Sequence, residues 1–177
     1  MGPTDSLANI TYKYELINTK RYDLYADDLA KRVNDANLGV TKIFGGGCKT
    51  YVYVAEKKNF NAARQACKKL SLDLASIPSY KEFDVIVKNL KGILTRAWVG
   101  AQVNGKDTKN DWEWLSGEPI SLDNKLWTRR KGYREPGETW RCGQLMADDN
   151  GKVNDGKGPS LGTHPCTYEK SVLCEVL

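Results

Sequence analysis

Trp98-Val99-Gly100-Ala101 lies between the first and second of four cysteines, Cys67, Cys142, Cys166 and Cys174, and it is the stretch from which the fold can be read. Its aliphatic and aromatic residues predict a short strand around Ala97 to Ala101. Similar compositions predict further strands at Lys49 to Val54, Trp112 to Leu115, Cys142 to Ala147 and Ser171 to Val176. The C-terminal part of the chain is therefore rich in short strands.

Two helices are predicted between the first and second of these strands. One runs from about Asn59 or Asn61 to Leu70, with an asparagine as its N-cap and its apolar residues on one face. The other begins at Ser79, where Ser79 and Glu82 form a Ser-x-x-Glu capping box, and continues to about Leu90. A strand, two helices and then several short strands are typical of an α+β fold, because a parallel sheet would need strict alternation.

The N-terminal part has a different pattern. Apolar residues recur at helical intervals from about Leu7 to Asn37, and Gly39 can close such a helix. Two arrangements remain open: a neck helix that leans on a partner chain, or a helix that packs on its own domain. Gly45-Gly46-Gly47 predicts a hinge after it. We therefore expect an N-terminal arm at 1–47 and a domain at 48–177.

Composition limits the class of protein. At 177 residues the chain is long enough for one domain and an appendage. Its five cysteines have no zinc-like spacing and only one histidine accompanies them, so disulfides in an oxidising, extracellular compartment are predicted. No apolar run is long enough to span a membrane. The whole net charge of +5 falls in 48–177, because residues 1–47 hold equal numbers of basic and acidic side chains.

The four cysteines, the Trp98 stretch, Glu135-Pro136 and Val153-Asn154-Asp155 follow one another in an order that resembles the C-type lectin-like domain, from about Cys48 to the C-terminus. The resemblance implies bridges Cys67–Cys174 and Cys142–Cys166. It also implies that the Trp98 stretch is a core strand in which glycine lets a neighbouring backbone approach closely.

A long charged stretch from Ser116 to Trp140 follows the predicted strand at Trp112. Its entry, with Trp112, Trp114 and Trp127, is similar to that of secreted arthropod lectins of the haemolymph. We interpret these tryptophans as packing inside the loop region rather than as platforms for sugar. A stretch of this length without periodicity is usually functional or disordered.

The resemblance also implies a Ca²⁺ site, with Glu135, Glu138, Asn154 and Asp155 as ligands of both the ion and a sugar. Carboxylate and amide oxygens are the ligands that Ca²⁺ prefers. The sequence departs from the family pattern in three places: Gly137 replaces an asparagine, Trp140 stands where a glutamate ligand is common, and Val153 replaces a tryptophan. The family also implies a cis bond before Pro136.

Four basic residues, Arg129, Arg130, Lys131 and Arg134, stand beside this site in the sequence. They predict binding of sulfated or carboxylated glycans, with solvated loop charge as the alternative. In the family, a Glu-Pro-Asn motif implies mannose-type sugars. No motif for reading nucleic acid is present.

Cys48 remains after the two implied bridges are formed, which predicts an interchain disulfide or a buried free thiol. Asn9-Ile10-Thr11 is an acceptor triplet for N-glycosylation and adds support for secretion. The sequence thus favours a secreted, calcium-dependent lectin of innate immunity, oligomeric with another C-type lectin chain through its N-terminal helix. The alternative is a protein-binding adaptor with a degenerate sugar site, and enzymatic activity is not predicted.

Overall fold

The structure, a computed structural model, describes residues 20–37, 39–46, 49–128, 138–147 and 158–176. Three helices are seen in this part of the chain: α2 (Lys20–Asp35), α3 (Phe60–Lys69) and α4 (Tyr80–Asn89). The strands are β1 (Val40–Gly46), β2 (Lys49–Lys58), β3 (Asp73–Leu74), β4 (Arg96–Val103), β5 (Trp112–Trp114), β6 (Cys142–Met146), β7 (Ser160–His164) and β8 (Lys170–Val176). The predicted α+β fold is confirmed.

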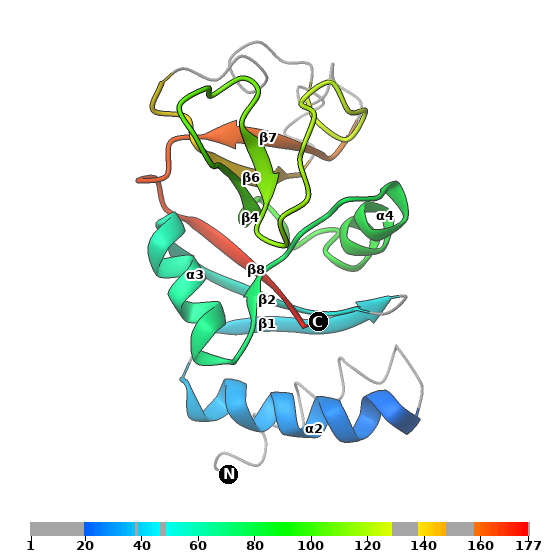
Figure 1. Cartoon of the computed structure of the whole chain (residues 1–177). Coiled ribbons are helices and arrows are strands. Elements are labelled where there is room, and N and C mark those ends of the chain that lie inside the picture. The colour runs from blue at the N-terminus through cyan, green and yellow to red at the C-terminus, as the bar shows by residue number, and fades with distance from the viewer. Residues whose placement is uncertain (1–19, 38, 47–48, 129–137, 148–157, 177) are drawn as a thin grey trace.

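All eight strands belong to one sheet, in which the order β1-β2-β8-β4-β6-β7 forms the main path and β3 and β5 pair at its side. The pairing of β4 with β8 is parallel and the other pairings are antiparallel. Figure 1 shows α3 and α4 on the two sides of this sheet, with β4, β6 and β7 at the end of the molecule away from α2.

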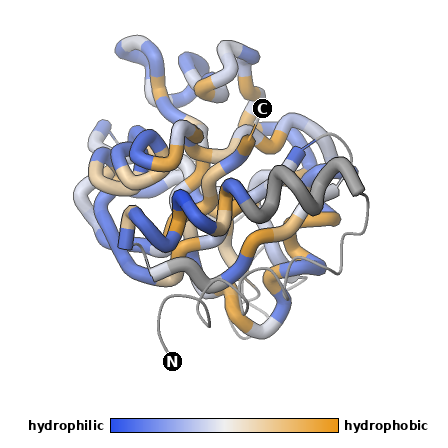
Figure 2. Tube along the Cα trace, turned by 90° about the horizontal axis from the view of Figure 1, so that it is seen from below, coloured by the Kyte–Doolittle hydropathy of each residue, from blue (hydrophilic) through white to orange (hydrophobic). Residues whose placement is uncertain are grey.

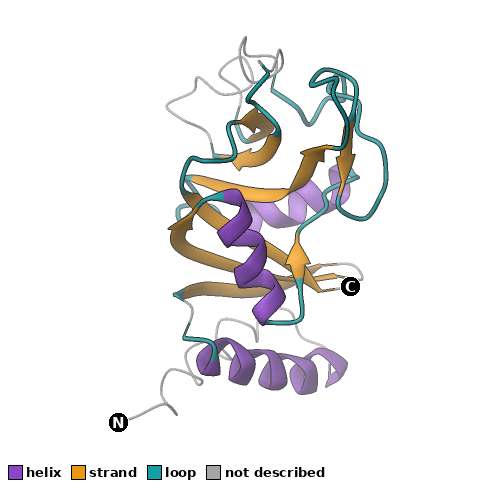
Figure 3. Ribbon diagram, turned by 60° about the vertical axis from the view of Figure 1, so that its left-hand side comes forward, coloured by secondary structure: helices purple, strands orange, loops and turns teal. Residues whose placement is uncertain are grey.

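The N-terminal helix packs on its own domain. Leu29, Ala30 and Val33 of α2 are buried, and they share a hydrophobic cluster with Ile43 of β1 and Val52 of β2. Figure 3 shows α2 beneath the sheet, and Figure 2, which is seen from below, shows α2 crossing the molecule on the side nearest the viewer. Of the two arrangements that the sequence left open, the structure shows the second. Residues 4–19, including Asn9, lie outside the described residues.

The prediction of a glycine hinge is wrong for Gly45 and Gly46, the two residues of the hinge that the structure describes. Gly45 and Gly46 belong to β1, where they pair with Thr50 and Lys49 of β2. A Cβ atom added to Gly46 would collide with the side chain of Val85 on α4, so glycine is needed here for close packing. Gly47 and Cys48 lie outside the described residues. The arm and the domain are joined by strand pairing across the predicted boundary.

Both predicted helix starts are confirmed. The Asn59 side chain accepts a hydrogen bond from the Ala62 N–H at 2.9 Å, and α3 begins at the next residue, Phe60. The Ser79 hydroxyl oxygen accepts one from the Glu82 N–H at 3.2 Å and itself donates to the Glu82 carboxylate at 2.9 Å. These caps satisfy N–H groups that have no partner inside the helix.

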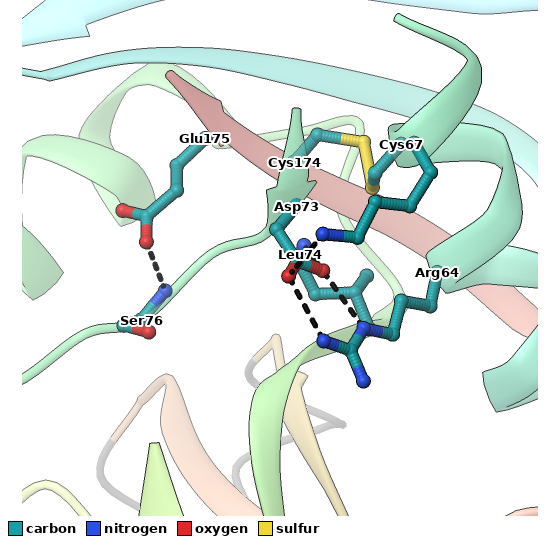
Figure 4. A network of polar contacts seen from close by, with 8 residues as sticks. Arg64, Cys67, Asp73, Leu74, Ser76, Cys174 and Glu175 are labelled. Carbon is teal, nitrogen blue, oxygen red and sulfur yellow. Dashed lines mark hydrogen bonds and ion pairs between the residues drawn. A yellow bond between two sulfur atoms is a disulfide. The ribbon is translucent and has the colours of Figure 1, made fainter. Parts of the chain in front are cut away.

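The two predicted disulfides are both formed. Cys67–Cys174 joins α3 to β8 across 107 residues, and Cys142–Cys166 joins the start of β6 to the loop after β7 across 24 residues. Beside the first bridge, Asp73 accepts hydrogen bonds from Arg64 and pairs with Lys68, which together fasten β3 to α3 (Figure 4). Burial alone would raise the pKa of Asp73, but these cations outweigh it and hold the pKa below its usual value.

The predicted core strand is confirmed as β4. Trp98 is fully buried, and its indole N–H donates to the Lys58 carbonyl at 2.9 Å and to the Tyr168 carbonyl at 3.2 Å. A Cβ atom added to Gly100 would lie 2.6 Å from the Leu74 carbonyl oxygen, and the Gly100 N–H donates to the Ala75 carbonyl at 2.7 Å. The close approach of β4 to the chain after β3 therefore depends on glycine at this position.

Candidate functional site

Most residues of the predicted calcium and glycan site lie outside the described part of the chain: Glu135, Asn154, Asp155, Arg129, Arg130, Lys131 and Arg134, together with Pro136. Glu138 is described, and it is exposed in a turn that leads toward β6. Among the described residues there is no group of three side chains that could hold a metal ion. The ligand set therefore stays a prediction.

The described flanks of the two predicted ligand stretches nevertheless meet on β6 and β7. The stretch 148–157 follows β6 and precedes β7, and these strands pair from Cys142–His164 to Met146–Ser160. The stretch 129–137 follows Thr128, whose N–H donates to the Leu161 carbonyl at 2.8 Å. Since Leu161 is next to Ser160, one flank of the first stretch and both flanks of the second lie at the same end of the β6–β7 pair.

The other flank of the first stretch is also anchored. After Glu138 the chain reaches Arg141, whose carbonyl accepts a hydrogen bond from the Val103 N–H of β4 at 3.0 Å. The Arg141 guanidinium donates to the Gly105 carbonyl. Cys142 then begins β6 and carries the bridge to Cys166. The scaffold around the predicted site is thus fixed by a disulfide, a strand pair and backbone hydrogen bonds.

The three tryptophans of the loop region are packed inside the protein. Trp112, Trp114 and Trp127 are at most 4% exposed, and the Trp127 ring centroid lies 5.9 Å from that of Trp112 and 6.2 Å from that of Trp114. The Trp112 indole N–H donates to the Thr108 carbonyl at 2.7 Å. The prediction that these tryptophans pack inside the loop region, and do not serve as platforms for sugar, is therefore confirmed.

Trp140 belongs to a second aromatic group that the sequence did not reveal. Its ring lies edge-on to the ring of His164, with the two ring centroids 5.1 Å apart. The centroid of the His164 ring lies 4.5 Å from that of Tyr168 and 6.5 Å from that of Trp98. Burial lowers the pKa of His164 to about 4, and the positive charges of Lys170 and Arg96 act in the same direction. The histidine is therefore neutral near physiological pH.

Lys170 is the other residue whose importance the sequence did not show. It begins β8 and is only 5% exposed, with its ammonium nitrogen 5.1 Å from the Trp98 ring centroid and 5.9 Å from that of Tyr168. Burial, together with charge repulsion from Arg96 and Lys57, lowers its pKa to about 8. A lysine at the start of a strand gives no signal of burial in the sequence. Only the fold brings Lys170, Arg96 and Lys57 together.

In the part of the chain that the structure describes, no helix has the length and apolar character needed to cross a membrane.

Comparison with known proteins supports the family that the cysteine frame implies. Killer cell lectin-like receptor 5 of Mus musculus is 27% identical over 116 residues, which are 66% of this chain and 41% of the receptor. The versican core protein of Rattus norvegicus is 26% identical over 132 residues, or 75% of this chain and 4% of that protein. The chain thus spans less than half of either relative. Both are mammalian, so they do not support the expected likeness to arthropod lectins.

Among solved structures, the carbohydrate-recognition domain of the mouse scavenger receptor C-type lectin superimposes with a TM-score of 0.58 at 25% identity. The superposition covers 76% of this chain and 92% of that domain. The family model described as "Lectin C-type domain" matches residues 56–176, which is more than half of the chain. The chain therefore belongs to the C-type lectin domain family and has its fold.

Proposed function

We propose that this chain is a secreted, calcium-dependent lectin that binds microbial or acidic glycans in innate immunity. One observation carries the proposal: one flank of the stretch that contains Glu135, and both flanks of the stretch that contains Asn154 and Asp155, lie at the same end of the β6–β7 pair. This arrangement of the flanks is what a site shared by two stretches about twenty residues apart requires. Membership of a family that includes a carbohydrate-recognition domain at 25% identity adds support.

The chemistry of the proposed ligand set suits calcium. Glu135, Glu138, Asn154 and Asp155 supply only oxygen atoms, and Ca²⁺ takes six to eight such ligands at roughly 2.3–2.6 Å. Glu138 is exposed and is therefore accessible to an ion. Trp140, at a position where the family often has a ligand, is instead packed against His164. Glu138 takes over that role in our proposal.

The class of glycan follows from the residues around these oxygens. The family motif for mannose-type sugars is Glu-Pro-Asn, and here Glu135 and Pro136 are followed by Gly137, which lacks the amide that would contact such a sugar. Arg129, Arg130, Lys131 and Arg134 add four positive charges, which favour sulfated or carboxylated glycans through charge-assisted hydrogen bonds. We therefore propose acidic glycans as the preferred ligands and mannose-type glycans as weaker ones.

A glycan array probed with the purified protein tests this function, with each condition repeated in a chelator of calcium. We expect binding to neutral and acidic glycans in calcium and loss of the neutral signal in chelator. The matched variants are Glu135→Gln, at the proposed ion ligand, and Glu118→Gln, at an exposed glutamate that also precedes a proline. Chelator-resistant binding of neutral glycans, or equal binding by both variants, would contradict the proposal.

A second function is favoured by the cysteine count. The two observed bridges use four of the five cysteines, and Cys48 is left over. A disulfide at Cys48 would link two C-type lectin chains, giving a protein-binding subunit whose sugar site has decayed. Electrophoresis with and without reductant tests this: a dimer that Cys48→Ser abolishes supports it, and a monomer under both conditions contradicts it.

A further inference from the structure

Lys170 differs from the partly buried Lys49 in having no acidic partner among the described residues. The Lys49 ammonium lies 2.9 Å from a carboxylate oxygen of Glu82 and 2.9 Å from one of Glu175. Lys170 is 5% exposed, and its ammonium lies near the rings of Trp98 and Tyr168. Buried charges are normally paired, because an isolated one loses its hydration without compensation. In the part of the chain that the structure describes, no carboxylate forms an ion pair with Lys170.

Strand register gathers further positive charge around it. In the sheet β8 lies between β2 and β4, with Lys58 opposite Lys170 and Ala97 beside Ser171. Arg96, at the start of β4, is thus level with Lys170, and Lys57 is next to Lys58. Neighbouring strands are about 4.8 Å apart, so Arg96 lies close to Lys170. Lys57 of β2 is also close, because its positive charge acts on Lys170. Their repulsion is one cause of the lowered pKa of Lys170.

These three residues line a pocket. It has a volume of about 290 Å³, and its remaining lining residues are Leu94, Thr95, Ala147 and Glu169. Glu169 is exposed, and in the described part of the chain no ion pair joins it to Lys57 or Lys170. Among the lining residues that the structure describes, three are basic and one is acidic, so this part of the lining has a positive excess while Lys170 is protonated.

We infer that this basic pocket of Lys57, Arg96 and Lys170 is a binding site for an oxyanion group, a sulfate or carboxylate such as an acidic saccharide carries. Guanidinium and ammonium donors suit such oxygens, since charge-assisted hydrogen bonds are the stronger kind. The Thr95 hydroxyl can donate as well. Because the volume is at the lower end of roughly 300–1,000 Å³ for small-molecule sites, the pocket takes one charged group and part of one sugar ring.

The site is independent of the proposed calcium site. None of its lining residues is among the proposed ligands Glu135, Glu138, Asn154 and Asp155, and no metal takes part in it. Binding here therefore persists in a calcium chelator. A failure of the calcium-dependent function would leave this inference standing, and the reverse also holds.

Calorimetric titration in chelator and low salt tests the inference with three probes: sodium sulfate, a 6-sulfated N-acetylglucosamine, and the same sugar without sulfate. We compare the wild type with Lys170→Met and Lys57→Met. Lys81→Met removes an equal charge from an exposed site on α4 and is the matched control. Lys170→Arg keeps the charge and tests rescue.

We expect the sulfated sugar to bind the wild type and the Lys81→Met variant equally. The Lys170→Met substitution should weaken the binding of this sugar by about ten-fold, as loss of a buried charged contact does. Lys57→Met weakens it less, and Lys170→Arg restores part of the binding. If sodium sulfate binds as well as the sulfated sugar, the anion alone is the ligand of the pocket. Equal binding by wild type, Lys170→Met and Lys57→Met, or binding of the unsulfated sugar, would overturn the inference. Lys57 is exposed, so the Lys57→Met variant tests the pocket at a second position without changing a buried side chain.

Discussion

The ammonium nitrogen of Lys170 lies 5.1 Å from the centroid of the Trp98 ring, which places a positive charge against the most buried aromatic side chain of the core strand. The same indole donates hydrogen bonds to the carbonyls of Lys58 and Tyr168. Trp98 therefore joins β2 and the turn before β8 and also forms one wall of the Lys170 environment. A residue that the sequence marks as core thus shapes a charged site.

Replacing Lys170 by methionine should stabilise the protein. The folded-state pKa of about 8 is below the ordinary 10.5, so the unfolded chain binds more protons between these values. The stability of the wild type consequently rises as pH increases from about 8 to 10.5. At neutral pH the positive charge of Lys170 lowers that stability. We expect Lys170→Met to raise the melting temperature at neutral pH by ~2–4 °C, for about 1 kcal/mol, and to flatten the rise above about pH 8. A lower melting temperature than that of the wild type would contradict this.

The only histidine of the chain allows a direct test of the second aromatic group. Since the pKa of His164 is lowered to about 4, the folded state takes up its proton later than the unfolded state as pH falls. Stability contributed by the neutral ring is complete above about pH 6.5 and is lost as pH falls toward 4. NMR titration of the single imidazole should give a midpoint near 4. A midpoint near 6.5 would mean that the ring is solvated.

The close approach of β4 to the chain after β3 predicts that Gly100→Ala is strongly destabilising. The added methyl group would meet the backbone carbonyl oxygens of Leu74 and Ala75 at 2.6 and 3.1 Å, and neither can move without disturbing the sheet. We expect a loss of about 1–3 kcal/mol or more in denaturant unfolding. Gly39→Ala is the control, because its methyl group would meet nothing closer than Glu56 at 3.6 Å. Equal stability of the two variants would contradict the packing described.

The two disulfides should contribute unequally to stability. Cys67–Cys174 closes 107 residues and Cys142–Cys166 closes 24, and a longer loop loses more conformational entropy in the unfolded chain. On the loop-entropy relation the first bridge contributes about 5 kcal/mol and the second about 3 kcal/mol. Urea unfolding of the paired serine variants measures both values. The reverse order would show that native-state effects dominate.

Local signals in the sequence were sufficient for the helices of the domain and for its core strand. Asn59 and Ser79 satisfy N–H groups within one turn, so their effect does not depend on the rest of the fold. β7 was missed because Ser160, Gly162 and Thr163 are small and lack a strand pattern; their burial comes from pairing with β6. The glycines of β1 were misread as a hinge because the contact with Val85 is made by a distant helix.

The candidate site was harder to predict, because its contacts also join residues that are distant in the sequence. The bridges Cys67–Cys174 and Cys142–Cys166 came from the family frame, and no spacing rule alone would have paired them. The Lys170 pocket depends on three strands being adjacent in the order β2-β8-β4, an order that is not the order of the sequence. Trp140 could be recognised as a departure from the family, but its contact with His164 is made only in the fold.

Calcium titration followed by thermal unfolding of the wild type, Glu135→Gln and Glu118→Gln tests the central claim most directly. An ion that binds only the folded state raises the melting temperature, by an amount that grows with the ratio of ion concentration to Kd. We predict that calcium raises the melting temperatures of the wild type and Glu118→Gln alike and leaves that of Glu135→Gln nearly unchanged. The same rise in all three proteins, or no rise in the wild type, would contradict the proposed calcium-dependent lectin site.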